Sequence, residues 1–175
     1  MHIILQTPRL MFRRFTDSDA DAAFILELNS NIEVLKYLHE PILQDAAHAR
    51  EILQTIILPQ YEENLGRWAV HLNENNQLIG WCGLKYRPEL DETDLGYRFI
   101  KSAWSQGYAT EAAAATLQYG FKILQLKTIT GRAHINNIAS LAFLKKIGMQ
   151  FIREENIDHC PVKIFVAENS RNKSQ

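Results

Sequence analysis

The segment from residue 104 to residue 112 has the composition of a loop that holds phosphate groups through its backbone. Gly107 and Ala109 carry little or no side chain, so a pyrophosphate could approach the amides of residues 106–110 without help from a lysine. An Ala-rich helix is predicted to begin here, and the first turn of a helix offers unpaired N–H groups and a favourable dipole. A tight turn that packs a helix on a sheet would explain the same spacing, so both interpretations stay open at this point. The candidate residues are Gln106, Gly107, Tyr108, Ala109 and Thr110, whose hydroxyl could add one bond.

The common nucleotide-binding motifs are absent from the sequence. No Gly-Lys-Ser/Thr ends the loop and no Gly-x-Gly-x-x-Gly occurs, which argues against nucleoside triphosphates and dinucleotides. A second cluster lies downstream, where a predicted strand meets an amphipathic helix that we expect Asn137 to begin. Its pattern is His134-x-x-Asn137-x-x-Ser140-x-x-x-Leu144-x-Lys146-x-Gly148.

Hydrophobic periodicity predicts the elements that must position these clusters. In the first half, a strand at 10–13 precedes a helix that is capped within 16–19 and runs through Leu28, and a second helix runs from Asp45 to near Pro59. Strands at 68–72, 78–84 and 93–100 then form an antiparallel meander, with a turn at 73–76. In the last part come a helix at about 107–123, a strand at 128–133, a helix at 139–147 and strands near Phe151 and Ile164. The mixed order predicts an α+β fold.

Composition and charge restrict the class of protein. The chain has 175 residues, of which 46% are hydrophobic and 22% charged, so we expect one domain over residues 1–168 and a polar tail over 169–175. A net charge of -1 gives no global electrostatic reason to expect a nucleic-acid or membrane-surface partner. Cys82 and Cys160 form no Cys-x-x-Cys pair, and no apolar run approaches the ~20 residues of a membrane span. These features predict a soluble cytoplasmic protein.

The two clusters, together with the opening Thr7-Pro8-Arg9-Leu10-x-Phe12-Arg13-x-Phe15-x-x-x-Asp19, resemble the GNAT superfamily of N-acetyltransferases, and within it the RimJ/RimL-type branch. The resemblance covers nearly the whole domain. It implies a central, twisted, mostly antiparallel sheet of about seven strands that splays at its middle strands, with about four helices on both faces. It also implies acetyl-CoA as the acetyl donor and a primary amine as the acceptor, attacked directly in a ternary complex.

The resemblance also implies roles for individual residues. Backbone atoms near Phe99 and Ile100 would bind the pantetheine arm in the manner of an added strand, and one N–H would face the thioester oxygen. Asn137 would bond the pantetheine from the opposite strand, although an N-cap role alone would also explain it. Ser140 would protonate the leaving thiolate or orient a water that does so, while a surface or cap serine is the plainer interpretation.

The general base has more than one candidate. The resemblance places Asp94 on the strand beside the acceptor and makes it the first candidate, with a solvated strand-end carboxylate as the alternative. His71 is the second candidate, and a water relay alone would suffice for an α-amino group, whose pKa is near ~7.7. Related sequences of the branch often carry an aromatic residue and a proline where this chain has Arg98 and Lys101, and glutamate where it has Asp94.

The remaining expectations concern metals, partners and rival functions. His39-Glu40 and His134 lack metal-ligand spacing, so no metal is predicted, and Trp68, Trp81 and Trp104 are expected to pack mainly in the core. The acceptor, a protein N-terminus or a small amine, would be selected by residues 32–40 and 86–92, which carry no readable motif. The oligomeric state stays open, a homodimer included. The rival functions are a non-catalytic acyl-CoA-binding or sensing module and an ATP-binding protein.

Overall fold

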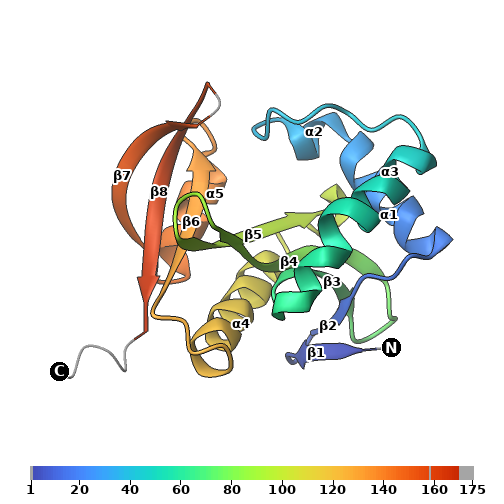
Figure 1. Cartoon of the computed structure of the whole chain (residues 1–175), viewed down its shortest axis with the longest axis horizontal. Helices are drawn as coiled ribbons and strands as arrows, with labels where there is room; N and C mark the ends of the chain where they lie inside the picture. The colour runs from blue at the N-terminus through green and yellow to red at the C-terminus, as the bar shows by residue number, and fades with distance from the viewer. Residues whose placement is uncertain (1, 158, 170–175) are drawn as a thin grey trace.

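A computed structural model of the chain describes residues 2–157 and 159–169. Its centre is one eight-stranded sheet in the order β1-β2-β3-β4-β5-β6-β8-β7 (Figure 1). All neighbouring strands are antiparallel except β5 and β6, which run parallel. The strands are β1 (Ile3–Gln6), β2 (Leu10–Arg14), β3 (Gly66–Leu72), β4 (Leu78–Arg87), β5 (Glu92–Phe99), β6 (Thr128–His134), β7 (Gln150–Ile157) and β8 (Cys160–Glu168).

Five α-helices accompany the sheet in the described part of the chain. They are α1 (Asp19–Ser30), α2 (Ile32–Leu35), α3 (Ala46–Ile52), α4 (Tyr108–Lys122) and α5 (Ile138–Lys146). Ser18 caps α1 by accepting the N–H of Asp21, so the predicted cap is confirmed. None of the helices in residues 2–157 and 159–169 is both long and apolar enough to cross a membrane.

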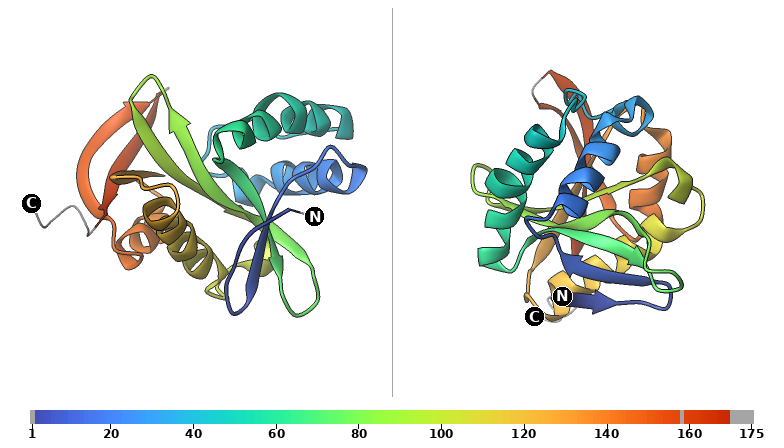
Figure 2. Two further views of the ribbon diagram at one scale, coloured as in Figure 1. Left: turned by 60° about the horizontal axis from the view of Figure 1, so that its bottom comes forward. Right: turned by 90° about the vertical axis from the view of Figure 1, so that its right-hand side faces the viewer.

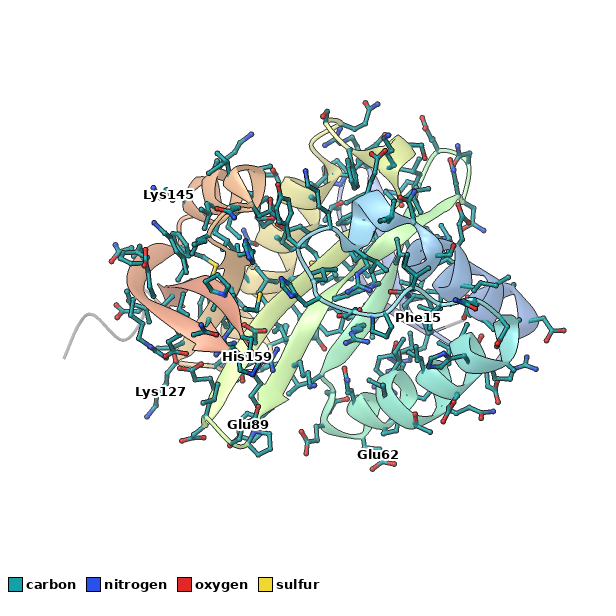
Figure 3. The ribbon with its side chains drawn as sticks, turned by 90° about the horizontal axis from the view of Figure 1, so that it is seen from above. Phe15, Glu62, Glu89, Lys127, Lys145 and His159 are labelled. Atoms are coloured by element: carbon teal, nitrogen blue, oxygen red, sulfur yellow. The ribbon has the colours of Figure 1, made fainter. Side chains whose placement is uncertain are left out.

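The helices cover both faces of the sheet, as predicted. The segment from α1 through α3 lies over one face, and α4 and α5 lie over the other (Figure 2). Side-chain alternation along the strands assigns the two faces: Cys82 contacts Thr116 of α4 and Tyr97 contacts Ser140 of α5, whereas Arg98 points the other way, to Asn29 of α1. In the view from above, the helical segment that carries Glu62 and the helix that carries Lys145 lie at opposite ends of the molecule (Figure 3).

Three local predictions were incomplete or wrong. The strand β1 and the short helix α2 were not predicted, because each is too short to show a period. The helix from Asp45 does not end near Pro59: α3 continues as the π-helical turn η1 (Leu53–Ile57) and the 3-10 turn η2 (Leu58–Glu63). Pro59 fits because it lies in the first turn of η2, where its missing N–H costs nothing.

Asn169, the first residue of the predicted tail, packs against the rest of the fold. Asn169 is buried, and its side-chain amide donates to the carbonyls of Phe121 and Leu126, both at 3.2 Å. It therefore belongs to the fold and fastens the end of β8 beside α4. The other residues of the predicted tail, 170–175, lie outside the described residues.

The sheet splays between its two parallel strands. β5 and β6 are paired only at Asp94–Thr130 and Leu95–Gly131, and beyond these pairs the strands diverge (Figure 1). The other neighbours of the two strands stay paired along their lengths, β5 with β4 and β6 with β8. The carboxyl half of β5 therefore has one edge without a partner strand in the described structure.

Candidate active site

The open edge of β5 presents the backbone of Tyr97 and Phe99. The N–H of Ile100 donates to the carbonyl of Ile79, 3.0 Å away, so the backbone groups of even-numbered residues point towards β4. Because these groups alternate in direction along a strand, the N–H groups of Tyr97 and Phe99 point into the splay. An extended ligand could add to the sheet at this edge.

The prediction for Ile100 requires a correction. Its N–H is used by Ile79 and its carbonyl accepts the N–H of Ala103, 3.0 Å away, so neither group is free for a ligand. The carbonyl of Phe99 is also engaged, because it accepts the indole N–H of Trp104 at 2.9 Å. Tyr97, two residues before Phe99, therefore joins Phe99 in place of Ile100, and the strand period of two was the signal that could have identified it.

The first turn of α4 is left without a cap. Gly107 is the N-cap residue with φ +80°, a conformation that favours glycine, and no side chain of residues 2–157 and 159–169 accepts from the first N–H groups of the helix. The N–H of Glu111 is the first that bonds within the helix, to the carbonyl of Gly107 at 3.1 Å. The amides from Gly107 to Thr110 are thus available to an anion. The Tyr108 ring packs against the core.

The turn between β1 and β2 braces this loop. Arg9 donates to Glu111 Oε2 at 2.6 Å and to the carbonyl of Gln106 at 2.9 Å, and its guanidinium lies over the Tyr108 ring. The hydroxyl of Thr7 donates to the other oxygen of Glu111 at 2.6 Å. Arg9 thereby compensates the negative charge of Glu111. This matters because a free carboxylate at this end of the helix would repel the anion that is expected to bind there.

Asn137 caps α5 as predicted, and the cap uses only half of its side chain. Its Oδ1 accepts the N–H of Ser140 at 3.1 Å. The Nδ2 group has no hydrogen-bond partner among residues 2–157 and 159–169. The amide can therefore cap the helix and still donate to a ligand in the splay.

Ser140 and Tyr97 form a hydroxyl pair that joins α5 to β5. Their oxygens are 2.8 Å apart, and the Tyr97 ring lies against Phe143 with 4.4 Å between centroids. Burial raises the pKa of Tyr97 to about 12, so the phenol keeps its proton at neutral pH. Either hydroxyl can donate a proton or pass one to the other.

Asp94 is neither a solvated strand-end carboxylate nor a free base. It is buried, its Oδ1 lies 2.6 Å from Arg132 Nη1, and its Oδ2 lies 3.2 Å from Arg87 Nη2. Arg132 is also paired with Glu92. Burial raises the pKa of Asp94, while the two guanidinium groups oppose that rise. A carboxylate held on both oxygens has no open position from which to take a proton from an acceptor.

His71 is likewise fully engaged, on the face covered by α1. Its Nε2 accepts from Arg13 Nε at 3.0 Å, and its Nδ1 therefore donates to the carbonyl of Asn76 at 2.9 Å. Arg13 is itself paired with Asp21. The geometry makes His71 a structural, neutral histidine. Burial lowers its pKa, which the bond to Asn76 partly offsets.

We expect His71 to make the protein less stable in mild acid. Because the folded pKa lies below the unfolded value of about 6.5, the unfolded chain binds a proton on His71 at a pH where the folded protein does not. The stability advantage of the wild type over His71→Gln should shrink below pH ~6.5, by at most about 1.4 kcal/mol per pH unit. Urea unfolding of both proteins at a series of pH values measures this. A difference in unfolding free energy that does not vary with pH would contradict the neutral assignment.

A cavity of about 150 Å³ lies on the opposite face of the sheet from α4 and α5. Its wall is apolar on the side of α1 and η1, where isoleucines line it. The sheet contributes Trp81, Arg67 and Arg98, and the loop after α2 contributes Glu40. Trp81 thus lines the cavity. Trp68, as expected, is fully buried in the core, whereas Trp104 is 41% exposed beside Phe99.

Three potential metal ligands meet although the sequence spacing gave no sign of them. Ligand atoms of His39, His134 and Cys160 lie within 4.8 Å of one another, from the loop after α2, the end of β6 and the start of β8. Nδ1 of His134 accepts the N–H of Asn136 at 3.1 Å, so the proton of the neutral ring is on Nε2. A metal ion at His134 would therefore have to replace either the Asn136 N–H hydrogen bond at Nδ1 or the ring proton at Nε2. The expectation of no metal stays a prediction.

Comparison with known proteins agrees with this geometry. Residues 9–150 match the model of the family described as "Acetyltransferase (GNAT) domain". The chain is 32% identical over 151 residues to the uncharacterized N-acetyltransferase YoaA of Bacillus subtilis, covering 86% of this chain and 84% of that protein. A GNAT-family acetyltransferase from Bacillus anthracis superposes with a TM-score of 0.80 at 27% identity, covering 97% and 99% of the two chains. The ribosomal L7/L12 α-N-protein acetyltransferase RimL, in complex with coenzyme A, shares the fold with a TM-score of 0.80 at 16% identity, covering 95% and 98%.

Proposed function

The chain belongs to the GNAT family of acetyltransferases and is an N-acetyltransferase that uses acetyl-CoA, and on that premise we propose that a primary amine attacks the acetyl group directly in a ternary complex. In this reaction the amine nitrogen forms a bond to the acetyl carbon, the carbon–sulfur bond breaks, and coenzyme A leaves as a thiol. The observation that carries the proposal is the open edge of β5 beside the uncapped first turn of α4. A rival non-catalytic module is not favoured, because the matched family is one of acetyltransferases.

Backbone groups and one side-chain amide of the described residues would hold the donor. The amides from Gly107 to Thr110 would hold the pyrophosphate, and Gln106 precedes them in the loop that Arg9 braces. The backbone of Tyr97 and Phe99 would pair with the pantetheine amides, and the Nδ2 of Asn137 would donate to them from the other side of the splay. One of the backbone N–H groups would face the oxygen on which charge develops.

Ser140 and Tyr97 would supply the proton for the leaving sulfur. They join the two sides of the splay, and their short contact lets Tyr97 replace a proton that Ser140 gives away. A thiolate is a good leaving group, with a pKa near ~8.5 for a thiol, so only modest acid assistance is needed.

We expect Ser140→Ala and Tyr97→Phe each to lower kcat about 10-fold. Because the two hydroxyls would act as one unit, the double variant should be no slower than the slower single variant. The dissociation constant of acetyl-CoA, measured by calorimetry, should change little. Wild-type kcat in Ser140→Ala would exclude the hydroxyl from the proton transfer, and independent effects that multiply would contradict the shared unit.

No side chain of the described structure is proposed to take the proton from the amine directly. Asp94 and His71 are both fully engaged, so we assign Asp94 a positioning role towards Arg87 and Arg132. An acceptor amine that is already neutral, with water to carry the proton away, satisfies the chemistry for an α-amino group with a pKa near ~7.7.

The acceptor would approach on the face of the cavity, because the donor occupies the splay and the face of α4 and α5. A protein N-terminus or a small amine remains the proposed class. The test is an assay of coenzyme A release from acetyl-CoA with peptides of free N-terminus, amino acids, polyamines and aminoglycosides. Release that rises with none of these amines above hydrolysis would count against amine acetylation.

A further inference from the structure

The cavity on the acceptor face carries more positive than negative charge. Arg98 is 91% buried, since its exposed fraction is 9%, and it is paired with both oxygens of Glu40 at 2.9 and 3.0 Å. Arg67 lines the same cavity and has neither a hydrogen bond nor an ion pair from its guanidinium within residues 2–157 and 159–169. Among the residues that the structure describes, Glu40 is thus the only carboxylate that lines the cavity, for two guanidinium groups.

Both arginines lie against the same indole. The Arg67 guanidinium is 5.0 Å from the ring centroid of Trp81, and that of Arg98 is 5.7 Å away. The ring face favours each cation but does not neutralise it. Burial and the nearby Arg98 charge lower the pKa of Arg67, yet a guanidinium stays protonated at neutral pH.

Two unsatisfied groups mark where a ligand would bind. The Nε of Arg98 is buried without a hydrogen-bond partner in the described part of the chain. The Arg67 guanidinium is half-buried and makes no hydrogen bond or ion pair with the described residues. Lys85 lies on the same face of β4 as Trp81 and adds a further positive charge near Arg67. Arg98 is paired with Glu40, whereas the half-buried Arg67 guanidinium has no carboxylate partner among the described residues, so an anion that enters this cavity is stabilised.

This inference rests on the proposed function: we infer that the acceptor is a primary amine that also carries a carboxylate and has the size of a single apolar amino acid. Arg67, which lies beside Arg98, would bind the carboxylate. Three observations on the cavity select this class. The planar guanidinium matches a carboxylate, as the bidentate Arg98–Glu40 contact illustrates. The isoleucine wall accommodates an apolar body, and about 150 Å³ suffices for a small side chain. Polyamines would bring further positive charge into a cationic cavity and are excluded.

The test compares amines of one carbon skeleton. L-leucine, L-leucinamide and isopentylamine differ only at the carboxyl position, and kcat/KM is compared per neutral amine by measuring at several pH values. We expect leucine to exceed the other two by about 10-fold in the wild type, the free energy of one charge-assisted hydrogen bond. In Arg67→Gln the ratio of leucine to the other two amines should fall towards one, and Arg67→Lys should restore part of this ratio. The control is Arg50→Gln, which replaces an arginine on α3 outside the cavity and should leave the ratio unchanged.

A binding measurement separates this inference from the proposed function. Calorimetry with leucine should show binding to the coenzyme A-loaded wild type that weakens about 10-fold in Arg67→Gln, whether or not turnover is observed. Equal binding to both proteins, or binding to neither, overturns the carboxylate site. Acetylation of isopentylamine as efficient as that of leucine overturns it as well, and leaves the proposed acetyltransfer intact. Preference for O-phosphoethanolamine over leucine would replace the carboxylate by a phosphate and overturn the proposed class.

Discussion

Gly107→Asp is expected to weaken acetyl-CoA binding at least about 100-fold relative to Gly107→Asn. Both side chains have the same size, and both tolerate the left-handed backbone at φ +80° better than other residues do. The two variants differ by one negative charge, which lies at the N-terminal end of α4 where the pyrophosphate is expected to bind. A carboxylate at about 5 Å from a phosphate, at an effective dielectric constant of about 20, costs roughly 3 kcal/mol.

The matched pair isolates the charge from the strain. A Cβ at position 107 would lie 3.3 Å from Arg9 Nη2, which is tight for both variants. Arg9 is already paired with Glu111, so a second carboxylate at position 107 would share one guanidinium charge with Glu111. Titration calorimetry gives the two affinities, and urea unfolding checks that the variants lose equal stability. Equal affinities for acetyl-CoA would remove the loop from the phosphate site.

Local features of the site could be predicted from sequence, because the physics that produces them is local. An asparagine followed three residues later by a serine at the start of a helix predicts a cap, and Asn137 accepts from Ser140 as expected. A glycine before an Ala-rich helix predicts a turn, and Gly107 has the positive φ that such a turn requires. The positions of the main strands along the chain followed from hydrophobic alternation for the same reason.

Features that depend on convergence of distant segments could not be predicted. Tyr97 and Ser140 are 43 residues apart, and only the packing of α5 on β5 brings their hydroxyls together. Arg67, Arg98 and Glu40 come from two strands and a loop, and no spacing in the chain links them. The departure at Arg98 was visible in the sequence, but its meaning required knowing that Arg67 shares the same cavity.

In the proposed function, the two faces of the sheet divide the work of the enzyme. The face of α4 and α5 offers backbone amides and hydroxyls, which suit a donor with phosphates and a thioester. The face of α1 and η1 offers guanidinium groups and an apolar wall. The strands β5 and β6 splay between the two faces, and we propose that the acceptor reaches the acetyl group there without displacing the donor.

Asp94 is one of the last two residues of β5 that pair with β6 before the splay, and its replacement is expected to affect stability more than chemistry. Asp94→Asn removes the charge that lies between Arg132 and Arg87, and leaves the buried Arg132 with Glu92 as its remaining carboxylate partner. Loss of one partner of a buried ion pair costs about 3–5 kcal/mol. Glu154→Gln is the matched control: it removes an exposed carboxylate of the same sheet, paired with Lys163, and should cost no more than about 1 kcal/mol.

Activity of Asp94→Asn then distinguishes positioning from proton abstraction. If Asp94 only holds Arg87 and Arg132, kcat/KM should fall by the same factor at every pH from about 6 to 9, under conditions where the variant remains folded. If Asp94 instead took the proton from the amine, the loss would shrink as pH rises, because the acceptor would lose its proton unaided. A variant as stable as wild type with a loss confined to low pH would therefore contradict the ion-pair role. A variant that is less stable, with a pH-independent loss, would place Asp94 in the framework that keeps the end of the splay in register.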